Sequence, residues 1–318
     1  MPGVTKEQIA AAKSVAAIDF LKRYRSEELV RAGSRGEFQL RSHDSFKISE
    51  RTSLWHWKSR DIGGRSALDY LIHVEGRSFV EAVLTLSEEA FPTRTQLPKA
   101  EPKRELVLPP AAENNRRVFA YLMQRGIDRR VIESCVRSGL LYESAAHHNA
   151  VFVGRDESGV PRYVFLRGTC TLGKPFKCEA AGSDKRYSFC LSPEGESRRA
   201  AIYEAAVETL AHLTLEGRAD KYRLSLGGVC APREGEQRRP FKTPPALDAL
   251  LARKPEIQEI EICLNNDFAG RWAAEHIARA YQDRYRIIQN LPEREGCDYA
   301  DLAQEKREAA RSRAAFSR

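Results

Sequence analysis

Acidic side chains recur in this sequence where apolar segments end, and they are the residues best suited to chemistry. Three such places hold Glu204 with Glu208, Asp267, and Asp298 with Asp301. Clustered carboxylates repel one another unless a hard dication neutralises them, and Mg²⁺ prefers a few carboxylates together with water and substrate phosphate. In polynucleotide chemistry such ions activate the attacking oxygen and stabilise the leaving oxygen. For any single acid, the alternative is a helix cap without a metal.

The elements that would position these acids alternate between strand and helix from residue 200 onward. The apolar strand segments are AIYEA, YRLSLGGV, EIEICLNND and YRIIQNLP, and helical patterns follow up to residue 215, at 247–252 and at 269–281. This alternation predicts a mainly parallel sheet flanked by helices. Because the carboxyl ends of parallel strands lie along one edge, where open α/β folds bind ligands, the acids can converge there.

The motifs YEAAVE, SLGGV, LNNDFAGRWAAEHI and CDYADLA resemble the successive motifs of a Toprim domain over the last third of the chain. Toprim domains are Rossmann-like, magnesium-binding folds of bacterial primases, topoisomerases and some nucleases. The resemblance implies that Glu204 is a general acid or base and a metal-site residue, with Glu208 as the acid one turn later. It matches Asp267 to the second aspartate of Asp-x-Asp. It also matches Asp298 and Asp301 to the later acidic pair. Two glycines would allow close backbone approach or form an ordinary turn: Gly227 and Gly228.

The sequence departs from the Toprim pattern at Asn265, which stands where the first aspartate of Asp-x-Asp is expected. The site loses a negative charge there but keeps a carbonyl oxygen that can contact a cation, so metal affinity should fall. Three explanations stay open: a naturally weakened site, metal binding assisted by substrate phosphates, or an engineered substitution that traps an inactive enzyme.

The front of the chain predicts a small domain at 1–90. Thr5 can cap a first helix, a second helical pattern covers 16–24, and alternating runs at 37–40, 45–49 and 53–57 indicate strands. We expect Gly63 and Gly64 to break the chain before helices at 66–74 and 78–86. The segment 91–110 carries five prolines and is expected to be a linker.

This front domain resembles the zinc-binding module of bacterial primases through FQLRSHDSFKI, SLWHWKSRDIGG and RSALDYLIHVEGRSFVEAVLTL. Of its four ligand positions only His43 is kept, because those near Leu40, Trp57 and Arg60 hold residues that cannot bind zinc. We therefore expect no zinc. Since the module touches template DNA in primases, the resemblance implies DNA contacts by Lys58, Arg60 and Arg65. Trp55 and Trp57 would either stack on bases or face the core.

The middle segment at 111–198 contains two helical patterns at 114–125 and 128–138 and a hairpin formed by 150–155 and 162–167. It resembles the basic segment that precedes Toprim in primases and in related mobile-element proteins. The resemblance implies that the following residues hold nucleoside triphosphate and template–primer: Arg167, Lys174, Lys177, Lys185 and Arg186. The alternative is an ordinary solvated basic loop.

The composition narrows the class of protein. A net charge of +8 suits a polyanionic partner but decides little by itself. Seven cysteines without a CxxC pair argue against a disulfide framework and a structural zinc site. Since no apolar run is long enough for a membrane span and the start does not resemble a secretory signal, we expect a cytoplasmic protein without membrane contacts.

Together these features predict an α/β multidomain protein. A Toprim domain with a mainly parallel sheet at 199–305 follows a basic α+β domain at 111–198 and a zinc-less zinc-ribbon-like module, and a basic tail at 306–318 should fray. We expect a primase-like nucleotidyltransferase of a plasmid or mobile element, with Glu204 and Asp267 as catalytic residues. Its cofactor would be Mg²⁺ or Mn²⁺, and its partners DNA (single-stranded or template–primer), nucleoside triphosphates and a replication or helicase protein. The alternatives are a catalytically weakened DNA-binding protein and a Toprim nuclease. The expected metal ligands are Glu204, Asn265, Asp267, Asp298 and Asp301.

Overall fold

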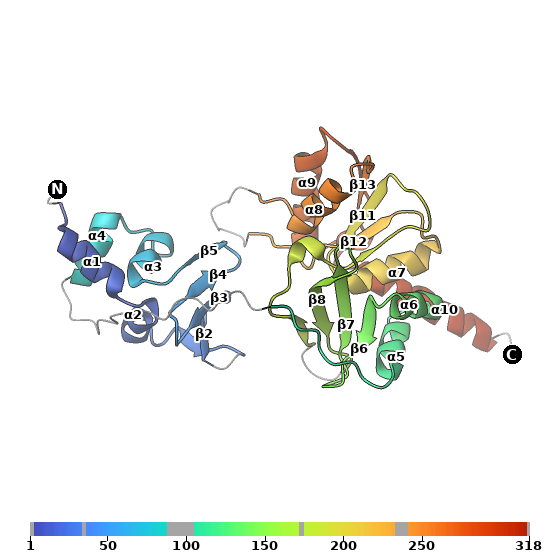
Figure 1. Ribbon diagram of the computed structural model, residues 1–318, viewed down its shortest axis with the longest axis horizontal. Coiled ribbons are helices and arrows are strands. Elements are labelled where there is room, and N and C mark those ends of the chain that lie inside the picture. Colours follow the sequence, from blue (N-terminus) through green and yellow to red (C-terminus); the bar gives the residue numbers. More distant parts are fainter. Residues whose placement is uncertain (1–2, 34–35, 88–104, 172–174, 233–240, 317–318) are drawn as a thin grey trace. The chain divides into compact units, whose positions relative to one another are not determined.

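A computed structural model describes residues 3–33, 36–87, 105–171, 175–232 and 241–316. The chain forms two compact units (Figure 1). Unit 1 consists of Met1–Pro102 with Pro232–Arg239, and unit 2 consists of Lys103–Ala231 with Pro240–Arg318. The predicted linker lies mostly outside the described residues.

In its described residues, unit 1 combines an antiparallel sheet with four helices. Its five strands pair in chain order: β1 (Leu29–Arg31), β2 (Glu37–Leu40), β3 (His43–Ser49), β4 (Trp55–Trp57) and β5 (Ile62–Gly64). Its helices are α1 (Lys6–Ser14), α2 (Ala17–Tyr24), α3 (Ala67–His73) and α4 (Phe79–Ser87). Thr5 forms the expected capping box with Gln8 at the start of α1.

The alternation of side chains along β4 shows which of the two predicted roles its tryptophans have. Trp55 and Trp57 are 1% and 2% exposed, whereas His56 between them is exposed. Both tryptophans pack in the core of unit 1, where Phe46 stacks on Trp55. The interpretation of these two residues as core residues is therefore confirmed, because an extended strand points alternate side chains to opposite faces.

The prediction that Gly63 and Gly64 break the chain is wrong, because both lie in strand β5. A Cβ atom on Gly63 would lie 2.8 Å from the carbonyl oxygen of Trp55, and one on Gly64 would lie 2.6 Å from Cβ of Asp69. These glycines allow β5 to approach β4 and α3 closely, a requirement that also accounts for glycine inside strands.

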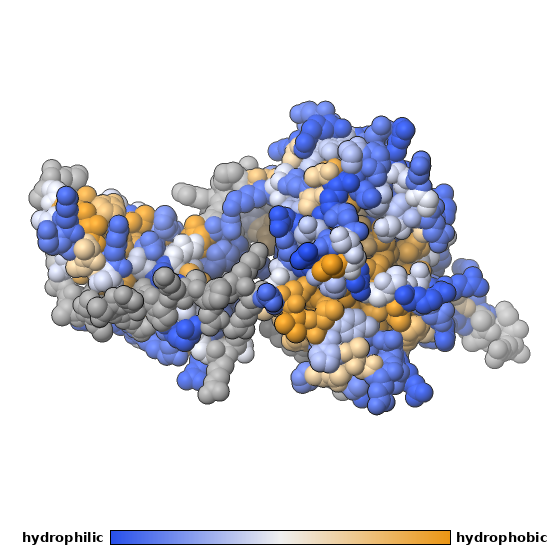
Figure 2. Space-filling view, in the orientation of Figure 1, coloured by the Kyte–Doolittle hydropathy of each residue, from blue (hydrophilic) through white to orange (hydrophobic). Residues whose placement is uncertain are grey.

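The first part of unit 2 is a four-stranded antiparallel sheet with two helices. The strands, in spatial order, are β6 (Leu141–Glu143), β7 (Ala150–Arg155), β8 (Pro161–Arg167) and β9 (Lys177–Glu179). The helices are α5 (Arg116–Gln124) and α6 (Arg129–Arg137). The pairing of β7 with β8 confirms the predicted hairpin. Figure 2 shows apolar residues at the surface over β7 and β8, where partly buried Leu106 and Leu166 cover Val151, Val153 and Val164.

The second sheet of unit 2 is mainly parallel, as predicted. Its order is β10 (Cys190–Leu191), β12 (Tyr222–Ser225), β11 (Arg199–Tyr203), β13 (Glu259–Ile262) and β14 (Arg286–Gln289). Only the pairing of β10 with β12 is antiparallel. The remaining elements are the 3₁₀ turn η1 (Lys185–Tyr187) and the helices α7 (Ala206–Glu216), α8 (Pro245–Arg253), α9 (Phe268–Tyr281) and α10 (Tyr299–Phe316).

Alternate residues of the central strand β11 face two different cores. Ala201 and Tyr203 pack with α5, α6, α7 and α10, whereas Ala200 and Ile202 pack with α8 and α9. The first core joins residues from both sides of residue 199, so the boundary predicted there lies inside one compact unit.

The basic tail after residue 305 was expected to fray, but α10 continues through it to Phe316. This stretch is rich in Ala, Arg, Glu and Lys, all strong helix formers, which favours continuation of the helix. None of the helices in the described ranges combines the length and apolar character that a membrane crossing requires.

Candidate metal-binding active site

The site forms where two neighbouring parallel strands end. Glu204 follows β11, and Asn265 and Asp267 follow the adjacent strand β13. The side-chain amide of Asn265 donates a hydrogen bond from Nδ2 to Oε2 of Glu204, at 3.0 Å. Residues 61 positions apart in the sequence therefore meet at one edge of the sheet, as the parallel topology requires.

Burial and three neighbouring charges affect the pKa of Glu204. Burial raises the pKa of Glu204, and the negative charges of Asp267 and Asp298 raise it further, whereas the ammonium group of Lys177 lowers it. Acids from three separate segments thus act on one another at this edge. Such mutual repulsion favours binding of a cation or a proton.

Glu208 lies one helical turn beyond Glu204 and is buried. Burial raises the pKa of Glu208 well above its usual value, and the charges of Asp298 and Glu204 add to the rise. Its Oε2 accepts a hydrogen bond from the backbone N–H of Ala205 at 3.0 Å. Glu208 therefore holds the start of α7 next to the site.

The three aspartates also serve as helix caps. Oδ1 of Asp267 accepts the N–H of Gly270 at 2.7 Å at the start of α9. Asp298 and Asp301 cap each other's backbone N–H groups before and in the first turn of α10, at 3.1 and 2.8 Å. The carboxylate of Asp301 is therefore engaged in the cap.

The side chains at this edge fit a magnesium ion that shares its coordination with a substrate. Oδ1 of Asn265 is buried and has no hydrogen-bond partner among the described residues, although it lies beside the carboxylate of Glu204. Such an orphaned acceptor is suited to a cation or a cation-bound water. Glu204, Asn265, Asp267 and Asp298 would hold the ion.

These acids do not enclose an ion by themselves. Within the described ranges, the only group of three His, Cys, Asp or Glu ligand atoms that lie within 4.8 Å of one another is elsewhere, at His212, Glu261 and Cys263. A site that offers one or two carboxylates is nevertheless typical of Mg²⁺, which keeps several waters and binds substrate phosphates.

The predicted glycine pair forms a turn beside this edge. Gly227 and Gly228 have φ values of +69° and +101°, a region that favours glycine. The N–H of Gly228 donates to the carbonyl oxygen of Glu204 at 2.9 Å. A Cβ atom on Gly227 would lie 2.9 Å from Oη of Tyr163. The turn thus supports the backbone of Glu204.

Two of the predicted basic residues lie at the site. Lys177 on β9 is exposed, and its charge lowers the pKa of both Glu204 and Glu208. Nζ of Lys185 donates to the carbonyl oxygen of Gly227 at 3.1 Å. Lys185 also forms an ion pair with Glu179 at 3.5 Å, so of the two only Lys177 acts on the acids through its charge, whereas Lys185 contacts the glycine turn beside them.

The other predicted basic residues of unit 2 have different surroundings. Arg167 pairs with Lys177 across β8 and β9 and donates from Nε to Oη of Tyr121 at 3.0 Å. Arg186 is exposed and forms an ion pair with Asp184. Lys174 lies outside the described residues.

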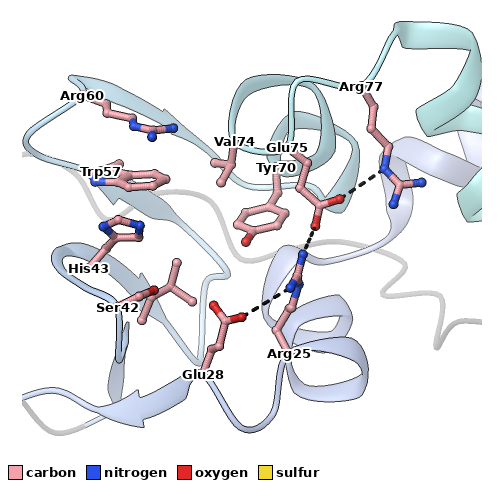
Figure 3. Close-up of a pocket in the computed structure, with 11 residues that line it drawn as sticks. Arg25, Glu28, Ser42, His43, Trp57, Arg60, Tyr70, Val74, Glu75 and Arg77 are labelled. Atoms are coloured by element: carbon pink, nitrogen blue, oxygen red, sulfur yellow. Dashed lines mark hydrogen bonds and ion pairs between the residues drawn. The ribbon is translucent and has the colours of Figure 1, made fainter. Parts of the chain in front are cut away.

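The side chains at the positions that the resemblance matched to zinc ligands line one pocket of about 510 Å³ (Figure 3). The His43 ring lies 4.6 Å from the Trp57 ring with an interplanar angle of 46°, and the Arg60 guanidinium lies 3.9 Å from the centre of the same ring. Aromatic and cation–π contacts thus hold these three side chains together. The remaining lining residues are Arg25, Glu28, Leu40, Ser42, Tyr70, Val74, Glu75 and Arg77.

The other two predicted DNA contacts of unit 1 differ in exposure. Lys58 is exposed directly after β4, whereas Arg65 is half-buried. The backbone of Arg65 joins several elements, since its N–H donates to Asp69 and its carbonyl oxygen accepts from Ala17 and from the Ser53 hydroxyl.

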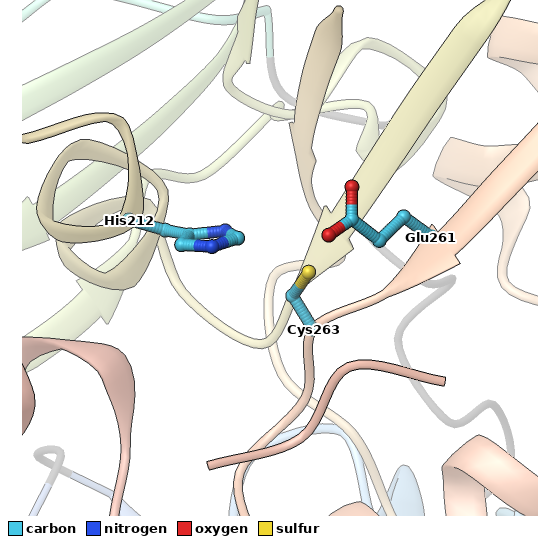
Figure 4. A group of neighbouring side chains, drawn as sticks. All are labelled: His212, Glu261 and Cys263. Carbon is cyan, nitrogen blue, oxygen red and sulfur yellow. The ribbon is translucent and has the colours of Figure 1, made fainter. Parts of the chain in front are cut away.

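Sequence reasoning missed a buried polar cluster that includes His212, Glu261 and Cys263 (Figure 4). This cluster lies behind the acid edge, which is the edge of the sheet that carries Glu204, Asn265 and Asp267. The carboxylate of Glu261 already accepts hydrogen bonds from Lys221 at 2.5 Å and from Asn290 at 2.7 Å. The lysine therefore occupies the cation position of this cluster, which argues against a metal there. Charged residues inside apolar strands, such as Glu261 in EIEI, were the available signal.

Part of the chain matches one protein family, and the chain is similar to several solved structures. A family described as a protein of unknown function, DUF3991, matches residues 120–195. No curated protein matches the chain. The chain is similar to the zinc-binding and RNA polymerase domains of Aquifex aeolicus primase, at 15% identity over 97% of this chain and 85% of that chain, with a TM-score of 0.40.

Two further solved structures are primase fragments as well. The primase fragment of the bacteriophage T7 primase-helicase is 13% identical over 84% of this chain and 93% of that chain, with a TM-score of 0.41. The Escherichia coli primase catalytic core is 17% identical over 64% of this chain and 73% of that chain, with a TM-score of 0.40.

Proposed function

We propose that the protein is a primase-like nucleotidyltransferase that acts on a DNA template with a divalent cation at the edge of the parallel sheet. The observation that carries the proposal is the hydrogen bond from Asn265 to Glu204 at the carboxyl ends of two neighbouring parallel strands. The negative charges of Asp267 and Asp298, which raise the pKa of Glu204, support it. The resemblance of the same residues to Toprim motifs supports the nucleotidyl-transfer chemistry.

In the proposed reaction, the acidic residues would bind the cation and accept a proton, and the basic residues would bind phosphates. A bound Mg²⁺ would stabilise the negative charge that develops on phosphate oxygens. Glu204, whose pKa is raised, is suited to accept the proton of an attacking 3′-hydroxyl. Glu204 would also hold the cation, together with Asn265, Asp267 and Asp298. Lys177 and Lys185 would bind the phosphates of the incoming nucleoside triphosphate.

One observation favours a second candidate, a catalytically weakened DNA-binding protein. The Asn265 amide group occupies Oε2 of Glu204 with a hydrogen bond, where an aspartate would contribute a second negative charge. Such a protein would bind strands, through unit 2 and through Lys58, Arg60 and Arg65 of unit 1, without extending them. A Toprim nuclease would use the same acids for cleavage.

The test is a template-directed assay with labelled ribonucleotides and deoxyribonucleotides, with Mg²⁺ and Mn²⁺ in parallel, scored for extension and for cleavage. Extension that is lost with a chelator and in Glu204→Gln supports the proposal. The matched control is Glu275→Gln, which changes an exposed glutamate of α9 paired with Arg279 and should keep full activity. Extension that persists in Glu204→Gln would refute the proposed site, and cleavage alone would select the nuclease.

Binding without catalysis is measured separately. DNA affinity should fall steeply with salt, because each phosphate contact releases counterions. Affinity that is retained in Glu204→Gln, together with no extension or cleavage by the wild-type chain, would select the DNA-binding protein. A flat salt response would remove DNA as the partner.

A further inference from the structure

A buried cluster of aromatic and charged side chains lies directly behind the acid edge. Tyr203 immediately precedes Glu204, and Tyr299 immediately follows Asp298. Both tyrosines are buried in the core shared by α7 and α10. Since alternate residues of a strand face opposite sides, Tyr203 points into this core from the backbone that carries Glu204.

His212 of α7 connects the two tyrosines. It lies 2.8 Å from Oη of Tyr203 through Nδ1, and its ring stacks on Tyr299 with centroids 4.0 Å apart and an interplanar angle of 29°. The side chain is 4% exposed. One residue therefore contacts the neighbours of both Glu204 and Asp298.

The direction of the hydrogen bonds follows from Arg223, which can only donate. Its Nη1 donates to Oη of Tyr203 at 2.8 Å, so the hydroxyl proton of Tyr203 is directed to Nδ1 of His212. Burial lowers the pKa of His212 to about 4, which keeps the ring neutral at pH 7. The tautomer that fits both neighbours has its proton on Nε2, which faces the carboxylate of Glu216 at 3.7 Å, and leaves Nδ1 to accept from Tyr203.

The second tyrosine is held at two points. Its ring stacks on His212, and its hydroxyl donates to the carbonyl oxygen of Asn290, just beyond β14, at 2.6 Å. The rings of Tyr203 and Tyr299 also meet edge to face, with centroids 6.2 Å apart. The start of α10, which carries Asp298, is thereby fixed against the end of β11, which carries Glu204.

We propose that His212 is a positioning residue for the cation site: by joining Tyr203 and Tyr299 it sets the separation of Glu204 and Asp298. This inference rests on the proposed function. It matters because Mg²⁺ demands near-ideal octahedral geometry, so a small change in ligand separation weakens binding. Residues that orient metal ligands from behind commonly change metal affinity by about 10–100-fold when they are replaced.

The test measures Mn²⁺ binding to the full chain by electron paramagnetic resonance, alongside thermal unfolding. His212→Phe keeps a ring on Tyr299 but removes the acceptor for Tyr203, and we expect the Mn²⁺ dissociation constant to rise about tenfold. His212→Asn keeps an acceptor near the Nδ1 position and should restore part of the affinity. Tyr299→Phe, which removes the hydroxyl contacts to Asn290 and to the Cys263 thiol but keeps the ring, is a milder variant that tests the same idea if His212→Phe does not fold.

The control is Leu250→Ala, a buried change on α8 in the other core of the sheet. It should lower the melting temperature while leaving the Mn²⁺ dissociation constant within about twofold of the wild type, since it does not touch either tyrosine. If His212→Phe and Tyr299→Phe behave like this control, the positioning role is wrong. If Glu204→Gln leaves Mn²⁺ binding and catalysis unchanged, it is the proposed function that fails.

Discussion

Replacing Asn265 by aspartate tests the electrostatics of the site most directly. In the wild-type chain the Asn265 amide donates to Oε2 of Glu204 at 3.0 Å. Asn265→Asp replaces this donor by a second carboxylate. We expect the variant to be less stable than the wild type without a divalent cation, to bind Mg²⁺ more tightly, and to show a higher rate of nucleotidyl transfer or cleavage.

The magnitude follows from the contact. Two carboxylates with charges about 4 Å apart repel by about 4 kcal/mol at an effective dielectric constant of about 20. The lost hydrogen bond to a charged group adds about 1.5–3 kcal/mol. Proton uptake by the carboxylate pair limits the total, because protonating one carboxylate about four pH units above its unfolded pKa costs about 5 kcal/mol. We therefore expect the free energy of unfolding to fall by about 5 kcal/mol at pH 8, which for a unit of this size corresponds to about 10–20 °C in melting temperature.

The pH dependence has a definite sign. The carboxylate pair in the folded variant has a higher pKa than the same groups in the unfolded chain, so the folded state binds more protons at intermediate pH. The loss of stability is therefore complete at high pH and diminishes as the pH falls. Thermal unfolding in chelator at pH 8 and at pH 5.5 measures this difference.

Asn266→Asp provides the matched control one residue away. The Asn266 amide donates to the carbonyl oxygens of Pro292 and Glu293, not to a carboxylate. Its new carboxylate would pair with Arg271, which already donates to Oδ1 of Asn266 at 3.0 Å, so Mg²⁺ should not stabilise this variant more than it stabilises the wild type. The reasoning is refuted if Asn265→Asp matches the wild type in chelator and shows the same Mg²⁺-induced rise in melting temperature.

Three further changes test other parts of the structure. The folded pKa of His212, about 4, lies below its unfolded value, so the unfolded chain binds more protons between pH 6.5 and 4. In urea denaturation the wild type should therefore lose about 3 kcal/mol more stability over this pH range than His212→Phe does. Equal pH dependence in the two proteins would contradict this. Trp57→Ala should destabilise unit 1 by about 3–5 kcal/mol, measured as faster hydrogen exchange in β3–β5. The control Leu54→Ala, at an exposed residue, should change the exchange little. Elemental analysis of the wild type should find no stoichiometric zinc. Gly270→Ala should cost about 1–3 kcal/mol in urea denaturation, because its Cβ would lie 2.0 Å from the carbonyl oxygen of Asn265, and wild-type stability would argue against this close approach.

Much of the secondary structure followed from local patterns. The apolar segments at 150–155 and 162–167 pair as a hairpin, and the alternation after residue 200 forms the parallel sheet. Asp267 stands at the end of its apolar segment and caps the next helix. These features depend on periodicity and on short-range hydrogen bonds, which a sequence displays directly.

Other features needed the tertiary structure because they join residues far apart in the chain. The sequence contained Glu204 and Asn265, but their hydrogen bond depends on β11 and β13 being neighbours in the sheet. Strand order is decided by packing of whole elements, so no local pattern encodes it. The same holds for the shared core that joins α5 and α6 to α7 and α10.

The sequence by itself therefore determined which residues could hold a cation and which kind of sheet would bring them together. Only the tertiary structure decided which oxygen of Glu204 is occupied by the Asn265 amide, and that His212 and two tyrosines lie behind the acids. The physical reason is that residue type and spacing are local properties. Burial, contact and pKa arise only when the folded chain excludes water and brings distant charges together.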